Sequence, residues 1–257
     1  MKKHNLGLVL SGGGARGLAH AGVLQALDEI GLPVNIISGT SSGAIIGVMY
    51  AAGVPPSEMV NIVSKSKLFD ITGISFDFKG LLKTKSFHKI LSQFVPMKTF
   101  EELAIPVMVC TTDFTRAKTI FHDKGPFEDV VVASCSIPLI FSPSIINGNM
   151  LVDGGLLNNF PIEPLINKCD HLLGVHVNPL GVFKRKNISG MIERCFQMAI
   201  SSGNRQKAKQ CTLFLEPPKL SNYTVFDTKH AKEIFALGYN EAMKKRDALE
   251  NMKMKIE

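Results

Sequence analysis

Within its first 53 residues the chain twice repeats one pattern: an apolar segment, a glycine-containing turn and a helical periodicity. The first unit is a predicted strand at 5–10, a turn over Ser11-Gly12-Gly13-Gly14, and a predicted helix at 15–30. The second is a predicted strand at 34–38, a turn over Gly39-Thr40-Ser41-Ser42-Gly43, and a helix through residue 52. Successive strand–turn–helix units are typical of parallel βαβ architecture. We therefore expect an α/β fold whose central, mostly parallel sheet is flanked by helices.

The rest of the chain continues the pattern less regularly. It predicts strands at 106–112, 118–122, 150–152, 171–177 and 213–216, and helices at 127–136, 191–209 and 227–249. Residues 66–100 are less periodic and are expected to form an excursion from the sheet. No repeat or low-complexity linker divides the 257 residues, so we expect one domain over residues 1–257.

Composition narrows the class of protein. The five cysteines are scattered without a CxxC pair, which favours buried, reduced thiols over a disulfide framework or a zinc site. The N-terminus lacks the apolar stretch of a secretory signal, and the most apolar window, 36–53, is interrupted by polar residues and glycines. These features predict a soluble, cytoplasmic protein.

The net charge of +7 includes a stretch rich in lysine and free of acids. Its lysines are Lys79, Lys83, Lys85 and Lys89, interleaved with phenylalanine and leucine. Basic and bulky apolar residues together suit peripheral contact with an anionic membrane, which for a cytoplasmic protein is the inner membrane surface. A solvated loop packed on the body of the protein fits the pattern equally well. We do not expect a nucleic acid partner, and the oligomeric state stays open.

The first turn matches the GxGxxG pattern of dinucleotide-binding proteins over Gly12-Gly13-Gly14-Ala15-Arg16-Gly17. That function needs an acidic residue at the end of the second strand, and residues 34–38 contain none. A glycine loop before a helix can instead direct backbone N–H groups at an anion. An ester hydrolase uses such donors for the oxyanion formed when its carbonyl is attacked.

The second turn has the GxSxG pattern of a nucleophile elbow. Ser41 has a glycine two residues away on both sides, which distinguishes it from the rival Ser42. The alternative for Ser41 is a helix N-cap without chemistry.

A serine nucleophile needs a base, and the histidines do not offer one in a recognisable motif. His88, His122, His171, His176 and His230 follow Ser41 in the chain. Asp153 is the better candidate, because it ends a predicted strand in Asp153-Gly154-Gly155 and should reach the sheet edge where Ser41 lies. A plain Asp-Gly turn is the alternative.

Four motifs together resemble the patatin-like phospholipase family, in its bacterial, single-domain form. They are Gly-Gly-Gly-Ala-Arg-Gly from Gly12, Gly-Thr-Ser-Ser-Gly-Ala from Gly39, Ala-Ser-Cys-Ser-Ile-Pro from Ala133, and Asp-Gly-Gly-Leu-Leu-Asn-Asn-Phe-Pro from Asp153, all within 7–165. The resemblance implies a three-layer patatin-like fold and hydrolysis of lipid acyl esters by a Ser–Asp dyad, without metal or cofactor.

Residue by residue, the resemblance assigns the nucleophile to Ser41 and its partner to Asp153. It assigns the oxyanion hole to Gly12, Gly13 and Gly14, a supporting role to Arg16, and motif positions to Gly39, Gly43, Gly154 and Gly155. This chain departs from the family pattern at two positions. It has Ser42 where the family often has alanine, and Leu139 where the family often has glycine after the Ser-Ile-Pro motif. A regulatory or lipid-binding protein with little turnover is the alternative.

Overall fold

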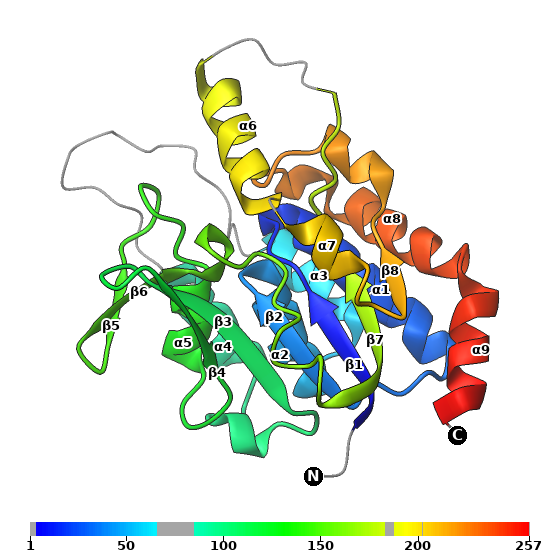
Figure 1. Cartoon of the computed structure of the whole chain (residues 1–257). Coiled ribbons are helices and arrows are strands. Elements are labelled where there is room, and N and C mark those ends of the chain that lie inside the picture. The colour runs from blue at the N-terminus through cyan, green and yellow to red at the C-terminus, as the bar shows by residue number, and fades with distance from the viewer. Residues whose placement is uncertain (1–3, 66–84, 183–187, 202, 257) are drawn as a thin grey trace.

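A single mixed sheet forms the centre of the molecule (Figure 1). The computed structural model describes residues 4–65, 85–182, 188–201 and 203–256. Within them, eight strands form one sheet in the order β5-β6-β3-β2-β1-β7-β8, with β4 also paired to β3. The strands are β1 (His4–Leu10), β2 (Ile36–Thr40), β3 (Val107–Asp113), β4 (Lys118–His122), β5 (Ser144–Ile146), β6 (Asn149–Asp153), β7 (Cys169–Val175) and β8 (Leu213–Leu215).

The middle of the sheet is parallel and one side is antiparallel. β1 pairs in parallel with β2 and β7, β2 with β3, and β7 with β8. β4 and β6 run antiparallel to β3, and β5 runs antiparallel to β6. The expectation of a mostly parallel sheet flanked by helices is confirmed.

The helices in the described residues are α1 (Leu18–Ile30), α2 (Ser42–Ala51), α3 (Pro56–Lys65), α4 (Lys85–Phe94), α5 (Glu128–Ser134), α6 (Ile188–Ser201), α7 (Asn204–Ala208), α8 (Ala231–Met243) and α9 (Arg246–Ile256). Short 3₁₀ turns are η1 (Gly14–Gly17), η2 (Phe100–Glu102), η3 (Gly154–Leu156), η4 (Pro218–Asn222) and η5 (Thr228–His230). The helix α1 packs against α3 and α8, which builds a helical layer on one face of the sheet.

Alternation along the strands divides the core between the two faces. Leu8 and Ile37 belong to a large cluster beneath the helical layer, whereas their neighbours Val9 and Ile36 belong to a smaller cluster on the opposite face. The smaller cluster is closed by Phe160, Ile162 and Leu165. On that side Lys207 of α7 donates to the Phe160 carbonyl at 3.2 Å. Helix layer, sheet and this outer layer make the three layers.

Three expectations from the pattern are wrong. The helix expected at 191–209 is two helices, because Gly203 adopts a left-handed φ of 82° before α7. The helix expected at 227–249 is likewise divided into α8 and α9, and α9 packs against α1. The five cysteines are all free, as expected, and Cys110, Cys135 and Cys169 are buried, but Cys211 is half-buried and Cys195 is exposed on α6, against the expected burial.

No helix among the described residues has both the length and the apolar character needed to cross a membrane.

Candidate functional site

Ser41 occupies a sharp turn between β2 and α2. Its φ of 53° and ψ of −121° lie in a region that non-glycine residues rarely adopt. A Cβ on Gly43 would lie 2.4 Å from the Leu10 carbonyl oxygen, and one on Gly39 would lie 2.7 Å from the Gly43 backbone. Glycine is therefore required on both sides of Ser41. Ser41 precedes α2 at the N-cap position but makes no side-chain capping bond, so the N-cap alternative does not describe its hydroxyl.

The turn is held by Ser134, at the end of α5. The Ser134 hydroxyl accepts the Ser41 N–H at 2.8 Å and donates to the Cys110 carbonyl at 2.6 Å. Because Cys110 lies in β3, this side chain ties the strained turn to the neighbouring strand. The sequence alone gives Ser134 no role. Its only signal there is its place in the Ala133–Pro138 motif, which contributes to the family resemblance.

The glycine loop lies directly against Ser41. A Cβ on Gly12 would lie 3.3 Å from the Ser41 Cβ and 2.5 Å from the Asn159 Oδ1. Gly14 has a φ of 59°, and a Cβ there would lie 2.2 Å from the Val225 carbonyl oxygen. Side chains are excluded at both positions, so this backbone can approach a ligand closely.

The loop N–H groups are not equivalent. Gly12 N–H already donates to the Asn159 carbonyl at 3.0 Å. Within the described part of the chain, Gly13 and Gly14 N–H have no backbone or side-chain acceptor. Of the three N–H groups expected to be donors, that of Gly12 is therefore engaged within the protein, whereas those of Gly13 and Gly14 could still meet a ligand.

Asp153 reaches Ser41 by a route that differs from the expected one. We expected it at the carboxyl end of a parallel strand, but β6 is antiparallel to β3. β6 ends where Asp153 pairs with Thr111, one residue beyond the position in β3 that pairs with Thr40. The short overlap of β6 with the second half of β3 therefore brings Asp153 beside the residue that follows Thr40.

The environment of Asp153 disfavours its charged form. The residue is 4% exposed, and burial raises the pKa of its carboxyl to about 7. The hydrogen bond from the Gly155 N–H, at 2.7 Å, and the nearby Ser41 side chain act in the opposite direction and lower the pKa. The structure thus places the Ser41 side chain next to the Asp153 carboxyl.

The other site residues lie around this pair. A Cβ on Gly154 would lie 2.3 Å from the Cys110 carbonyl oxygen, and one on Gly155 would lie 2.9 Å from the Asp153 Oδ1. Arg16 is 1% exposed in η1, where its backbone N–H donates to the Gly13 carbonyl at 3.2 Å. Asn159, which was not assigned a role, supplies the acceptor for Gly12.

The histidines have other partners. His20 is buried with its Nε2 2.8 Å from the Ser11 carbonyl, and burial lowers its pKa to about 4. His176 contacts Glu216 at 2.6 Å, and His122 contacts Thr111 at 2.8 Å. No hydrogen bond joins a histidine to Ser41 in the part of the chain that the structure describes. Nor does that part contain a group of three or more His, Cys, Asp or Glu side chains arranged to hold a metal ion.

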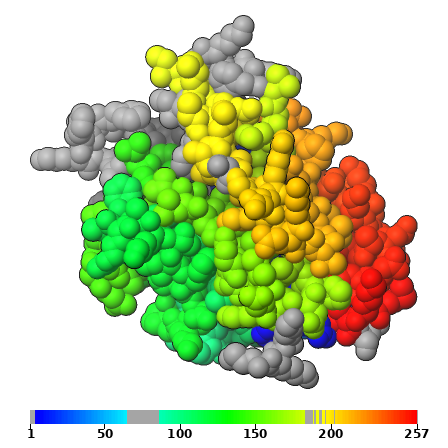
Figure 2. Space-filling model, viewed as in Figure 1, coloured from blue at the N-terminus to red at the C-terminus, as the bar shows by residue number. Residues whose placement is uncertain are grey.

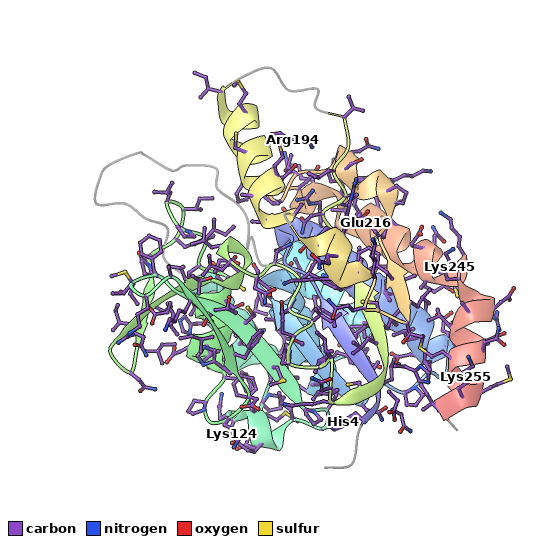
Figure 3. The ribbon with its side chains drawn as sticks, in the orientation of Figure 1. His4, Lys124, Arg194, Glu216, Lys245 and Lys255 are labelled. Atoms are coloured by element: carbon purple, nitrogen blue, oxygen red, sulfur yellow. The ribbon has the colours of Figure 1, made fainter. Side chains whose placement is uncertain are left out.

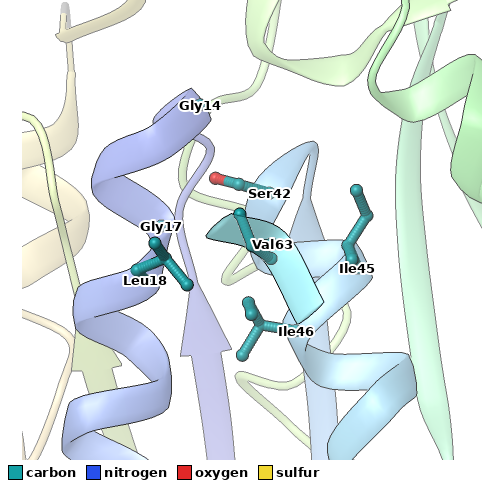
Figure 4. A pocket seen from close by; sticks show the side chains of 7 residues that line it. All are labelled: Gly14, Gly17, Leu18, Ser42, Ile45, Ile46 and Val63. Carbon is teal, nitrogen blue, oxygen red and sulfur yellow. The ribbon is translucent and has the colours of Figure 1, made fainter. Parts of the chain in front are cut away.

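A small apolar pocket lies next to the turn (Figure 4). It is lined by Gly14, Gly17, Leu18, Ser42, Ile45, Ile46 and Val63. Ser42 packs so closely on Gly17 that a Cβ there would lie 2.4 Å from the Ser42 Oγ. The Ser42 side chain therefore faces the helical layer, and it does not take the position of the nucleophile proposed for Ser41.

Comparison with known proteins relates this chain to one protein family. A family model described as patatin-like phospholipase matches residues 8–166. A lysophospholipase of Cryptococcus neoformans is 32% identical over 169 residues, which are 62% of this chain and 10% of the relative. An uncharacterised NTE family protein of Mycobacterium tuberculosis is 32% identical over 160 residues, covering 62% of this chain and 44% of the relative. The chain thus spans less than half the length of these relatives.

Solved structures agree on the fold. VipD from Legionella pneumophila matches with a TM-score of 0.53 at 16% identity, over 96% of this chain and 67% of the other. Human GIVD cytosolic phospholipase A2 matches with a TM-score of 0.53 at 12% identity, over 98% of this chain and 59% of the other.

Proposed function

Because the chain belongs to the patatin-like phospholipase family, we propose that it is a serine acyl-hydrolase that cleaves fatty-acyl esters of lipids. The observation that carries the proposal is the register that places the strained Ser41 turn beside the buried Asp153, whose pKa burial raises to about 7. An aspartate with its ordinary pKa, near 3.9, is a weak base, whereas a carboxyl with a pKa near 7 accepts a proton much more readily.

In the proposed mechanism, Asp153 accepts the Ser41 proton while Ser41 Oγ attacks the ester carbonyl. The carbonyl oxygen becomes an oxyanion, which the Gly13 and Gly14 N–H groups stabilise. Collapse of this intermediate forms the acyl-enzyme, and protonated Asp153 returns its proton to the departing alcohol. Asp153 then takes a proton from water, the hydroxide attacks the acyl-enzyme, and the fatty acid leaves as Ser41 regains its proton.

The fungal relative in the comparisons is named a lysophospholipase, which supports a lipid ester as substrate. The strained Ser41 turn and the two glycine N–H groups without acceptors support an acyl transfer over a binding role alone. A regulatory or lipid-binding protein with little turnover is the alternative.

A fluorophosphonate probe together with p-nitrophenyl acyl esters tests the proposal. We expect labelling and ester cleavage in the wild type and loss of both in Ser41→Ala. Ser42→Ala is the matched control, because it removes the neighbouring hydroxyl but should leave the probe on Ser41. Absence of both labelling and cleavage in the wild type would favour the binding alternative.

We also propose peripheral contact with an anionic lipid surface. Of the lysines expected to make it, Lys79 and Lys83 lie outside the described residues, as does the side chain of Lys85, while Lys89 is exposed on α4. A stripe on α6 supports the proposal further: Ile188, Met191 and Met198 are 78%, 54% and 56% exposed, and exposed Cys195 continues their helical spacing.

The position of α6 suits that contact. Figure 3 shows Arg194 of α6 at the upper edge and His4, at the amino end of β1, at the lower edge, so α6 stands on the side of the carboxyl ends of the parallel strands. In Figure 2 the yellow atoms of α6 project from this end of the molecule. The Lys184-Arg185-Lys186 sequence directly before α6 adds positive charge for anionic lipids.

Vesicle sedimentation tests the contact. We expect binding to vesicles containing anionic lipid that weakens with salt, and loss of binding in a Met191→Ser, Met198→Ser double variant. Equal binding of wild type and variant, or of neutral and anionic vesicles, would contradict it.

A further inference from the structure

The glycine loop is held from behind by the chain that follows β7. Ser11 N–H donates to the Val175 carbonyl at 3.1 Å, and Val177 N–H donates to the Ser11 hydroxyl at 3.0 Å. The pairing of β1 with β7 thus continues past both strands. The next residue in line is Asn178, which is 1% exposed.

The Asn178 side chain is hydrogen-bonded to the peptide group between Gly12 and Gly13. Its Nδ2 donates to the Gly12 carbonyl, and the Ser11 hydroxyl donates to the same oxygen at 3.0 Å. Because a carbonyl oxygen can only accept, the Asn178 atom that faces it must be the amide nitrogen. With Gly12 N–H donated to Asn159, both polar groups of Gly12 have fixed partners.

Ser41 and Asn178 lie on opposite sides of the loop. A Cβ on Gly12 would lie 2.5 Å from the Asn159 Oδ1 and 3.3 Å from the Ser41 Cβ, whereas a Cβ on Gly13 would lie 2.4 Å from the Val177 side chain and 3.3 Å from the Asn178 Oδ1. In a planar trans peptide the N–H points opposite to the C=O. A Gly12 carbonyl held toward Asn178 therefore directs the Gly13 N–H away from Asn178 and toward the side of Ser41.

The orientation of this peptide group has to be fixed by a contact from outside the loop. A peptide flip changes the ψ of Gly12 and the φ of Gly13, and glycine tolerates either orientation because it has no Cβ. The flipped state would present a carbonyl oxygen to the developing oxyanion. The buried Asn178 Oδ1 has no hydrogen-bond partner within the described residues, which is unfavourable for a residue kept for stability alone.

We propose that Asn178 is a positioning residue that holds the Gly12–Gly13 peptide with its N–H in the oxyanion hole of Ser41. The inference rests on the proposed acyl-hydrolase function. It predicts that Asn178 acts on the transition state and hardly on substrate binding, because the donor it orients meets negative charge only after attack.

Asn178→Leu removes the donor and keeps the branched shape of the side chain. We expect kcat to fall about 100-fold, comparable with removal of one oxyanion donor, and KM to stay within about threefold. Affinity for a lipid-like trifluoromethyl ketone, which forms a tetrahedral oxyanion on Ser41, should fall by a similar factor. Affinity for a non-hydrolysable ether lipid should not change.

Asn204→Leu is the matched control. Asn204 is also buried, at 6% exposed, and its amide bonds Ile200 and His176 rather than the loop. The control should lower the melting temperature as Asn178→Leu does, but keep kcat. Where Asn178→Leu does not fold, Asn178→Asp keeps the shape and replaces the donor by a carboxylate oxygen, and kcat at pH 8 should fall at least as far.

An unchanged kcat in a folded Asn178 variant would overturn the inference, as would equal losses of ketone and ether-lipid affinity. Failure of the proposed function itself looks different, because the wild type would then neither react with fluorophosphonate nor cleave esters.

Discussion

Replacing Asp153 by asparagine removes a carboxylate that the fold holds in an unfavourable ionised state. Asp153 is 4% exposed, and burial raises its pKa from 3.8 to about 7. Because the folded pKa exceeds the unfolded one, the unfolded chain releases this proton first as the pH rises. The stability of the wild type therefore falls between about pH 4 and about pH 7, and above that range the loss is complete.

The size of the loss follows from the two pKa values. The interval from 3.8 to about 7 corresponds to about 4 kcal/mol at pH 8 and to about 2 kcal/mol at pH 5. In Asp153→Asn this loss is absent, and the new amide oxygen can still accept the Gly155 N–H that Asp153 accepts at 2.7 Å. We expect the variant to be inactive and yet more stable than the wild type by about these amounts.

Urea unfolding of both proteins at pH 5 and pH 8, alongside ester cleavage, measures the effect. Asp113→Asn is a control of opposite sign, because hydrogen bonds from Arg116 lower the pKa of Asp113, so the variant should be less stable than the wild type at pH 8. The reasoning is refuted if Asp153→Asn is less stable than the wild type at pH 8, or if its advantage is the same at both pH values.

Four further predictions concern the same site. The kcat/KM for ester cleavage should fall below about pH 7 as Asp153 takes up its proton, and a limb near pH 4 would contradict the raised pKa. Ser134→Ala leaves the Ser41 N–H without its acceptor, so urea unfolding should show a loss of about 1–3 kcal/mol, together with slower turnover. Gly14→Ala should destabilise more than Gly53→Ala, because both have positive φ but only the first Cβ meets backbone, 2.2 Å away; equal unfolding midpoints would contradict this. Leu139 has a φ of 72° and is 90% exposed. Leu139→Gly should raise the unfolding free energy by about 0.5 kcal/mol, because the relief of left-handed backbone strain exceeds the entropy that a glycine loses on folding by about that amount.

Much of the candidate site could be predicted from local sequence. The predicted end of β1 at Leu10, directly before the glycines, is confirmed, whereas β2 runs through Gly39 to Thr40, two residues past its predicted end; both strand–turn–helix units were nevertheless recognisable because each part is specified by neighbouring residues. The divided helices could not be predicted in this way. The periodicity is continuous across Gly203, and the left-handed conformation of that glycine is one of several that it can adopt.

The sequence by itself determined the kind of fold and singled out Ser41 and Asp153 as the residues proposed for acyl transfer, since their motifs are short and contiguous. Only the tertiary structure decided how those residues lie relative to each other. An antiparallel register brings Asp153 beside Ser41, and burial, which depends on the whole fold, raises its pKa to about 7. Long-range hydrogen bonds from Asn159 and Asn178 hold the N–H and the carbonyl of Gly12, and the Gly13 and Gly14 N–H groups are the ones proposed to meet an oxyanion. Hydrogen bonds between residues about 150 positions apart leave no periodic trace in the chain, so no local pattern could have shown them.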